Sequence, residues 1–157
     1  MSHPVIVQFA PRFTALQALG ILRALYGREG SLEALPSERD QNFKVVAPDG
    51  AAFVLKIANG TERAEVLDFE NRAIAHLART ARNLSVPRLV PTLDGGEMGL
   101  VSGDASDAQH FVRLLTWIPG VPLALVKPHS EALLVSLGRT LAEMDRAFEG
   151  FEHPAMH

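Results

Sequence analysis

One lysine and one glutamate, Lys56 and Glu70, are the residues best suited to chemistry in this 157-residue sequence. Lys56 lies in the β-prone run AFVLKI, where its apolar neighbours require the ammonium either to reach solvent or to meet an anion. Glu70 follows 14 positions later (70 minus 56), in a segment whose apolar residues recur at helical spacing. A strand lysine held by a helix glutamate is predicted here, with a solvated surface ion pair as the alternative interpretation.

The elements that position these two residues are a hairpin and a helix. Three β-prone runs, at 32–35, 43–46 and 52–57, are separated by the polar segment SERDQN (37–42) and by the turn signal PDG (48–50). They predict three consecutive antiparallel strands, of which the third carries Lys56. Asn59-Gly60 then ends the strand, and Thr61 is predicted to cap the helix that carries Glu70.

The flanking segments complete an α+β pattern. A helix is predicted over 14–26, two or three strands over 88–93, 98–102 and 110–115, and a last helix through an apolar stripe of Leu134, Leu137, Leu141, Met144 and Phe148. Hairpin strands interrupted by a single helix indicate an α+β layer, because a parallel sheet needs a crossover between each pair of strands.

Composition limits the function classes. With 47% hydrophobic and 21% charged residues, the chain suits one globular domain. A net charge of -3 and the lack of any basic run argue against nucleic acid and membrane surfaces as partners. The absence of cysteine excludes thiolate chemistry and fits a cytoplasmic protein, and the histidines lack metal-ligand spacing, so no metal site is expected.

The segments FVLKIAN, FENRAIAHL and LPSERDQNF resemble the aminoglycoside phosphotransferase family, which has the protein-kinase-like fold, and within it the hydroxylysine-kinase-like branch. Some members of that branch are fused to a class III aminotransferase. The resemblance implies a kinase-like small lobe, with an antiparallel sheet of about five strands and one helix packed on it. It also implies an N-terminal helical extension (1–30), the nucleotide-binding small lobe (31–116), and a hinge with the first helix of a truncated large lobe (117–157).

Particular residues take roles by this resemblance. Lys56 matches the lysine that contacts the ATP phosphates, and Glu70 matches its partner. The segment from Ser37 to Asn42 matches the loop that covers the nucleotide, although it lacks the glycine pattern of protein kinases. The hinge that binds the adenine edge corresponds to Thr116, Trp117 and Ile118. From the residues alone, SERDQN is equally an ordinary polar loop and Trp117 an ordinary packing anchor.

The family's remaining catalytic motifs are missing from the sequence. No histidine is followed two residues later by aspartate, and no D-x-D is present. The resemblance therefore implies the ATP-binding lobe of a small-molecule kinase that is inactive as this chain and binds ATP with Mg²⁺ in a full-length protein. The acceptor implied is an amino alcohol or hydroxylated amino acid, bound mainly by the absent lobe. Pyridoxal phosphate would enter only if an aminotransferase domain follows.

Two further expectations concern partners. The alternative to a kinase lobe is a non-catalytic kinase-like interaction domain, fused to another enzyme such as a class III aminotransferase. A truncated large lobe would also leave apolar surface exposed between residues 117 and 148, through which two copies of the chain could associate.

Overall fold

The computed structural model describes residues 9–103 and 108–156, and they form an α+β fold, as predicted. Within these ranges, three helices and six strands follow one another: α2 (Ala15–Tyr26), β1 (Ser31–Leu35), β2 (Gln41–Val46), β3 (Ala52–Ile57), α3 (Ala64–Thr80), β4 (Leu89–Val90), β5 (Gly99–Val101), β6 (His110–Thr116) and α4 (Glu131–Ala147). Two short 3₁₀ turns lie at Leu123–Leu125 and Pro154–Met156. The strands match the predicted ones, with β4 shorter than expected.

The strands form one antiparallel sheet in the order β1-β2-β3-β6-β4, with β5 also paired to β6. Strand β3 is therefore flanked by β2 and β6. The register places Lys56 opposite Asn42 on one side and opposite Arg113 on the other. Because directly opposite residues of an antiparallel pair project from the same face, these three side chains share one face of the sheet.

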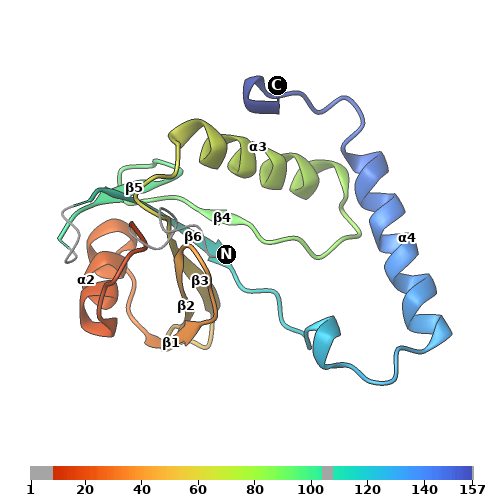
Figure 1. Cartoon of the computed structure of the whole chain (residues 1–157), viewed down its shortest axis with the longest axis horizontal. Coiled ribbons are helices and arrows are strands. Elements are labelled where there is room, and N and C mark those ends of the chain that lie inside the picture. Colours follow the sequence, from red (N-terminus) through yellow and green to blue (C-terminus); the bar gives the residue numbers. More distant parts are fainter. Residues whose placement is uncertain (1–8, 104–107, 157) are drawn as a thin grey trace, which may run out of the picture.

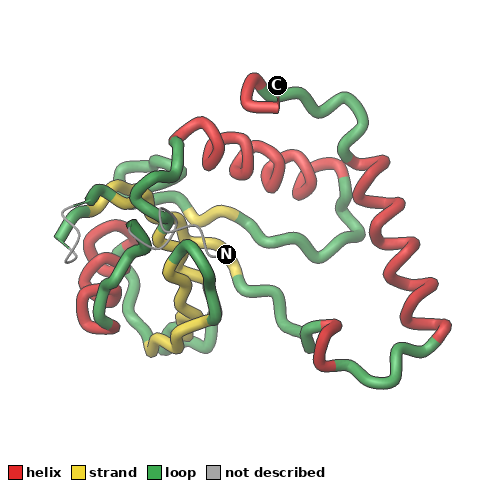
Figure 2. The backbone as a smooth tube through the Cα atoms, in the orientation of Figure 1, coloured by secondary structure: helices red, strands yellow, loops and turns green. Residues whose placement is uncertain are grey.

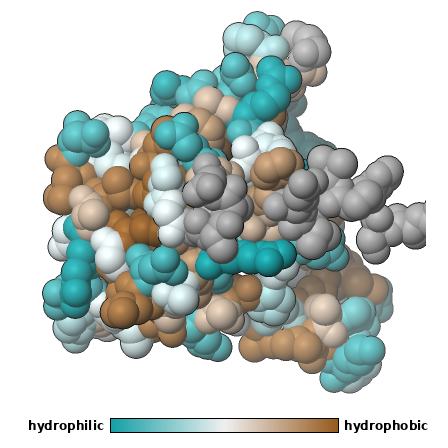
Figure 3. Space-filling model, turned by 60° about the vertical axis from the view of Figure 1, so that its left-hand side comes forward, coloured by the Kyte–Doolittle hydropathy of each residue, from teal (hydrophilic) through white to brown (hydrophobic). Residues whose placement is uncertain are grey.

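Helix α2 covers the other face of the sheet. Thr14 caps this helix and forms a capping box with Gln17, so the chain enters the helix with its first amides satisfied. Ala18, Leu22 and Tyr26 of α2 then pack into a core with alternate residues of β2, β3 and β6. The view of the α2 side in Figure 3 shows apolar patches among polar side chains, and Leu16 on this helix is 77% exposed.

Helix α3 begins three residues later than Thr61, so the predicted cap is wrong. Its N-cap is Arg63, which makes no side-chain cap bond. Oδ1 of Asn59 accepts from both the hydroxyl and the backbone N-H of Thr61, at 2.8 and 3.0 Å, so Thr61 belongs to the turn before the helix. The helix then runs alongside the sheet, as Figure 1 shows, with Leu67, Asn71 and Leu77 buried.

Helix α4 stands apart from the sheet. Ser130 caps it, and none of its residues is buried. The long segment between β6 and α4 is mostly irregular, as the loop colouring in Figure 2 shows. Contact with the rest of the chain comes at the C-terminal end, where Phe148 and Phe151 lie against the ring of His76 on α3. No helix in the described ranges is long and apolar enough to span a bilayer.

Candidate functional site

Lys56 lies at the centre of the sheet face that α2 leaves uncovered. Its strand neighbours Leu55 and Ile57 are fully buried on the α2 side, so alternation along the strand turns Lys56 the other way. Its own side chain is only partly buried. Throughout the described ranges, no carboxylate lies within ion-pairing distance of its ammonium, so the cation is left open to a ligand.

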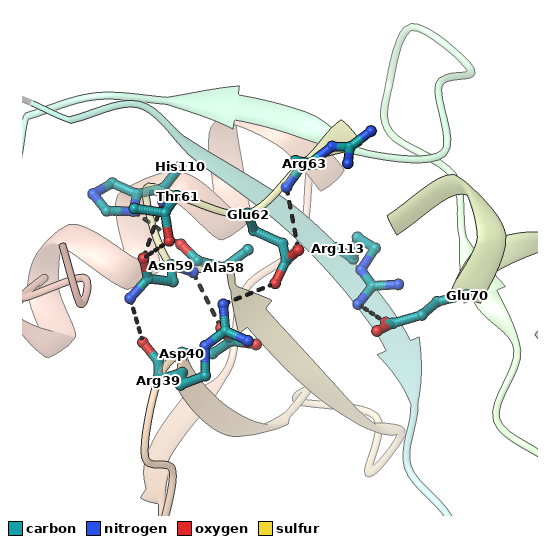
Figure 4. Close-up of polar contacts among 10 residues, drawn as sticks. All are labelled: Arg39, Asp40, Ala58, Asn59, Thr61, Glu62, Arg63, Glu70, His110 and Arg113. Carbon is teal, nitrogen blue, oxygen red and sulfur yellow. Dashed lines mark hydrogen bonds and ion pairs between the residues drawn. The ribbon is translucent and has the colours of Figure 1, made fainter. Parts of the chain in front are cut away.

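The predicted ion pair between Lys56 and Glu70 is not formed in the structure. The Glu70 carboxylate pairs with Nη2 of Arg113 (Figure 4). The neighbouring Asn71 accepts from Nη1 of the same guanidinium at 2.9 Å. The physical reason is the burial of Arg113, which is only 3% exposed. A buried guanidinium cannot lose its proton, so it requires the carboxylate more strongly than a partly solvated ammonium does.

The predicted nucleotide-covering loop is shorter than the sequence suggested. Asn42 belongs to β2, opposite Lys56, because the hairpin ladder begins at Gln41. Ser37 remains in the exposed loop between β1 and β2.

The base of this loop is fixed by Asn59, which is 1% exposed. Its backbone N-H donates to Asp40, its side-chain amide donates to the Arg39 carbonyl, and its Oδ1 accepts from Thr61 (Figure 4). An ion pair between Arg39 and Glu62 adds a second link between the loop and the segment that leads into α3. The loop, the end of β3 and the start of α3 therefore form one connected unit.

The three predicted hinge residues differ in what they can offer a ligand. The backbone N-H of Thr116 donates to the Arg88 carbonyl and that of Trp117 to the Ala52 carbonyl, so both are already engaged. Within the described part of the chain, no backbone carbonyl accepts the N-H of Ile118. Of the three, Ile118 therefore has the N-H donor that a nucleobase could use.

One buried acceptor on this face is left for a ligand that donates a hydrogen bond. Oδ1 of Asn42 is buried without a hydrogen-bond partner, directly opposite Lys56. A buried polar atom of this kind is uncommon in folded proteins and points to a partner that binds there. No group of three or more histidine or acidic residues in residues 9–103 and 108–156 is placed to hold a metal ion.

Sequence reasoning missed three residues of the site: Arg113, Asn59 and Lys44. The signal for Arg113 was an arginine inside the otherwise apolar run HFVRLL, where a charge must be paired. Nζ of Lys44 lies 4.6 Å from the centre of the Trp117 ring, a cation–π contact at the hinge. The contact between Lys44 and Trp117 could not be predicted from their spacing in the sequence. It depends on β2 and β6 lying on either side of β3 in the sheet.

The chain belongs to the phosphotransferase enzyme family, whose profile matches residues 31–157. This confirms the resemblance to the aminoglycoside phosphotransferase family. The chain is 31% identical to hydroxylysine kinase of Mus musculus and 32% identical to that of Danio rerio, over 93% and 92% of its own length. It spans only 41% of the length of each of these relatives.

Two solved structures share the fold. A structure titled as amicoumacin kinase in complex with AMP-PNP, Ca²⁺ and Ami superposes with a TM-score of 0.73 at 17% identity, over 98% of this chain and 44% of that one. A microcompartment-associated aminopropanol kinase superposes with a TM-score of 0.69 at 21% identity, over 90% and 43%. These likenesses confirm the kinase-like α+β architecture.

Proposed function

We propose that this chain forms the ATP-binding N-terminal lobe of a small-molecule kinase that phosphorylates a hydroxyl group of an amino alcohol or a hydroxylated amino acid. The observation that carries the proposal is the open cation of Lys56 on the sheet face beside the hinge. Family membership supports phosphoryl transfer, and the names of the hydroxylysine and aminopropanol kinases support the acceptor class.

The described residues suit a nucleotide whose phosphates lie at Lys56 and whose base lies at the hinge. Lys56 would neutralise phosphate charge, while Asn42 and Ser37 offer polar groups from the β1–β2 hairpin. The hinge segment from Thr116 to Ile118 would receive the base, with the Ile118 N-H as its donor. Mg²⁺ bound with ATP would supply positive charge at the phosphates.

The chain by itself is proposed to bind without transferring phosphate. It contains no H-x-D pattern to orient an acceptor hydroxyl and no D-x-D pattern to hold the metal. A segment corresponding to the remaining part of the longer relatives would bind the acceptor. The same segment would supply the groups that orient the hydroxyl and hold the metal.

Trp117 permits a direct test, because it is the single tryptophan of the sequence and lies at the proposed base site. Mg-ATP is expected to change its fluorescence in a saturable way. Lys56→Ala should weaken this binding by about tenfold or more, since a hydrogen bond to a charged group contributes roughly 1.5–3 kcal/mol. Lys127→Ala, which removes an exposed lysine in the segment before α4, is the matched control.

A fluorescence change that is equal in the wild type and in Lys56→Ala would contradict the assignment of Lys56. The alternative, a non-catalytic kinase-like interaction domain, is tested by the sequence of a longer protein that contains this chain. An H-x-D-x-x-x-x-N motif followed by D-x-D in the part that corresponds to the rest of the relatives would support the kinase lobe, and the lack of both motifs there would favour the interaction domain.

A further inference from the structure

Two basic side chains, Lys56 and Arg113, lie side by side on the sheet face opposite α2. The antiparallel register pairs Lys56 of β3 directly with Arg113 of β6. Like charges directly opposite each other in such a pair are destabilising, so the pair requires anions close by. The structure provides one of them from the protein, the carboxylate of Glu70.

Pairing of the Glu70 carboxylate with Arg113 is more favourable than its pairing with Lys56 would be. Its side chain is 4% exposed, and two consecutive residues of α3, Glu70 and Asn71, accept from its two terminal nitrogens. If Glu70 moved to Lys56, the buried guanidinium would keep only the neutral amide oxygen of Asn71. Loss of one partner from a buried ion pair is strongly unfavourable, whereas Lys56 can still reach solvent.

We propose that Arg113 is a positioning residue of the nucleotide site: it holds Glu70 on α3 and so leaves the Lys56 ammonium without a counter-ion among residues 9–103 and 108–156, ready for an anionic phosphate. This inference rests on the proposed function. The phosphate of the ligand then supplies the negative charge that Lys56 lacks. The position of α3 against the sheet is set by Arg113, with Asn71 as the second anchor.

Acylation of lysine amines tests which cation Glu70 serves, without any nucleotide. The sequence has only three lysines, Lys44, Lys56 and Lys127, so peptide mass spectrometry can follow each one. Glu70→Gln should leave the acylation rate of Lys56 at its wild-type value, because the carboxylate is not the partner of Lys56. Arg113→Met should lower that rate by about threefold, as the released Glu70 pairs with Lys56.

The double variant Arg113→Met/Glu70→Gln should return the Lys56 rate to the wild-type value, and Arg113→Lys should lower it less than Arg113→Met. Lys127 is the internal reference in every sample. A faster Lys56 reaction in Glu70→Gln, or an unchanged rate in Arg113→Met, overturns the proposal. If Glu70→Gln fails to fold because it leaves Arg113 unpaired, the single and double Arg113 variants still decide.

A second experiment, acylation in the presence of Mg-ATP, tests the proposed function independently of the role of Arg113. Mg-ATP added to the wild-type chain should protect Lys56 from acylation and leave Lys127 unprotected. Lack of protection contradicts the phosphate role of Lys56 and thus the proposed function. The comparison of Arg113 and Glu70 variants in free protein is unaffected by that result, so the two failures can be told apart.

Discussion

At the scale of single residues, Tyr26 shows how the core constrains a titratable group. Its ring is 5% exposed at the end of α2, and its hydroxyl donates to the carbonyl of Val112 on β6 at 3.1 Å. Burial disfavours the charged phenolate and raises the pKa of Tyr26 from 10.0 to about 12, although the positive charge of Arg113 acts in the opposite direction.

This shift predicts how stability depends on alkaline pH. The neutral phenol is favoured in the folded state, so its contribution is fully present below pH 10 and is lost as the pH rises towards about 12. We expect it to amount to about 2 kcal/mol in the free energy of unfolding. Denaturant unfolding of the wild type and Tyr26→Phe across this pH range measures it.

Tyr26→Phe is the control because it keeps the ring and removes the ionisable group. Since Tyr26 is the only tyrosine, its tyrosinate absorbance reports this one group. A midpoint near the ordinary value of 10.0 in the folded protein would contradict the prediction.

The residue scale also shows where sequence reasoning succeeds and where it fails. Lys56 could be predicted from the sequence because strand alternation turns it to the face away from its buried neighbours Leu55 and Ile57. Its partner could not, because the choice of Glu70 between Lys56 and Arg113 depends on the register of β3 with β6 and on the burial of Arg113. Sequence spacing brings Glu70 near this face and leaves the pairing open.

At the scale of elements, Asn59 links the β1–β2 loop to the end of β3 and the start of α3. We expect Asn59→Ala to lower the free energy of unfolding by roughly 2 kcal/mol, since it leaves buried partners unsatisfied. Hydrogen exchange should accelerate in residues 36–40, the loop that Asn59 holds. Mass spectrometry of peptides measures the exchange rate in this loop and, for comparison, in the strands of the sheet.

Asn83→Ala removes an exposed asparagine after α3 and is the control for this substitution. Unchanged exchange in residues 36–40 of Asn59→Ala would show that the loop is held by other contacts, such as the ion pair of Arg39 with Glu62.

The elements themselves were largely predictable, and the exceptions have local causes. Apolar periodicity identified α2, α3 and α4, and alternation with turn residues identified the strands. The start of α3 was misplaced because Thr61 looks like a cap in sequence, while a buried asparagine two residues earlier accepts its hydroxyl in the fold. The loop was overestimated because polar Gln41 and Asn42 continue the ladder of β2.

At the scale of the whole molecule, the chain is a packed lobe with an attached helix. The sheet and α2 share a buried core, and α3 is joined to β6 through the contacts of Arg113 with Glu70 and Asn71. Helix α4 contacts α3 through rings at its C-terminal end. A hydrogen bond of 2.9 Å between Nε2 of His153 and Oδ2 of Asp68 adds to this attachment. The sequence predicted α4 as an amphipathic helix. The position of α4 against α3 could not be predicted, because it depends on contacts made by Phe148, Phe151 and His153, which follow the helix.

Helix α4 presents an apolar stripe to solvent. Leu134, Leu137 and Leu141 share one side of the helix by their spacing and are 50%, 36% and 51% exposed. A stripe of this kind usually meets a partner, and in the longer relatives more chain is available to cover it. For this chain alone, we predict that two copies associate through the stripe.

Leu137→Glu/Leu141→Glu should abolish this association while changing the free energy of unfolding by less than about 0.5 kcal/mol per site, because the replaced side chains are largely solvated. Sedimentation velocity over a range of protein concentrations measures the association. Arg139→Glu, on the same helix and off the stripe, should associate like the wild type. A wild-type chain that stays monomeric at every concentration would show that the exposed leucines of α4 do not pair with a second copy.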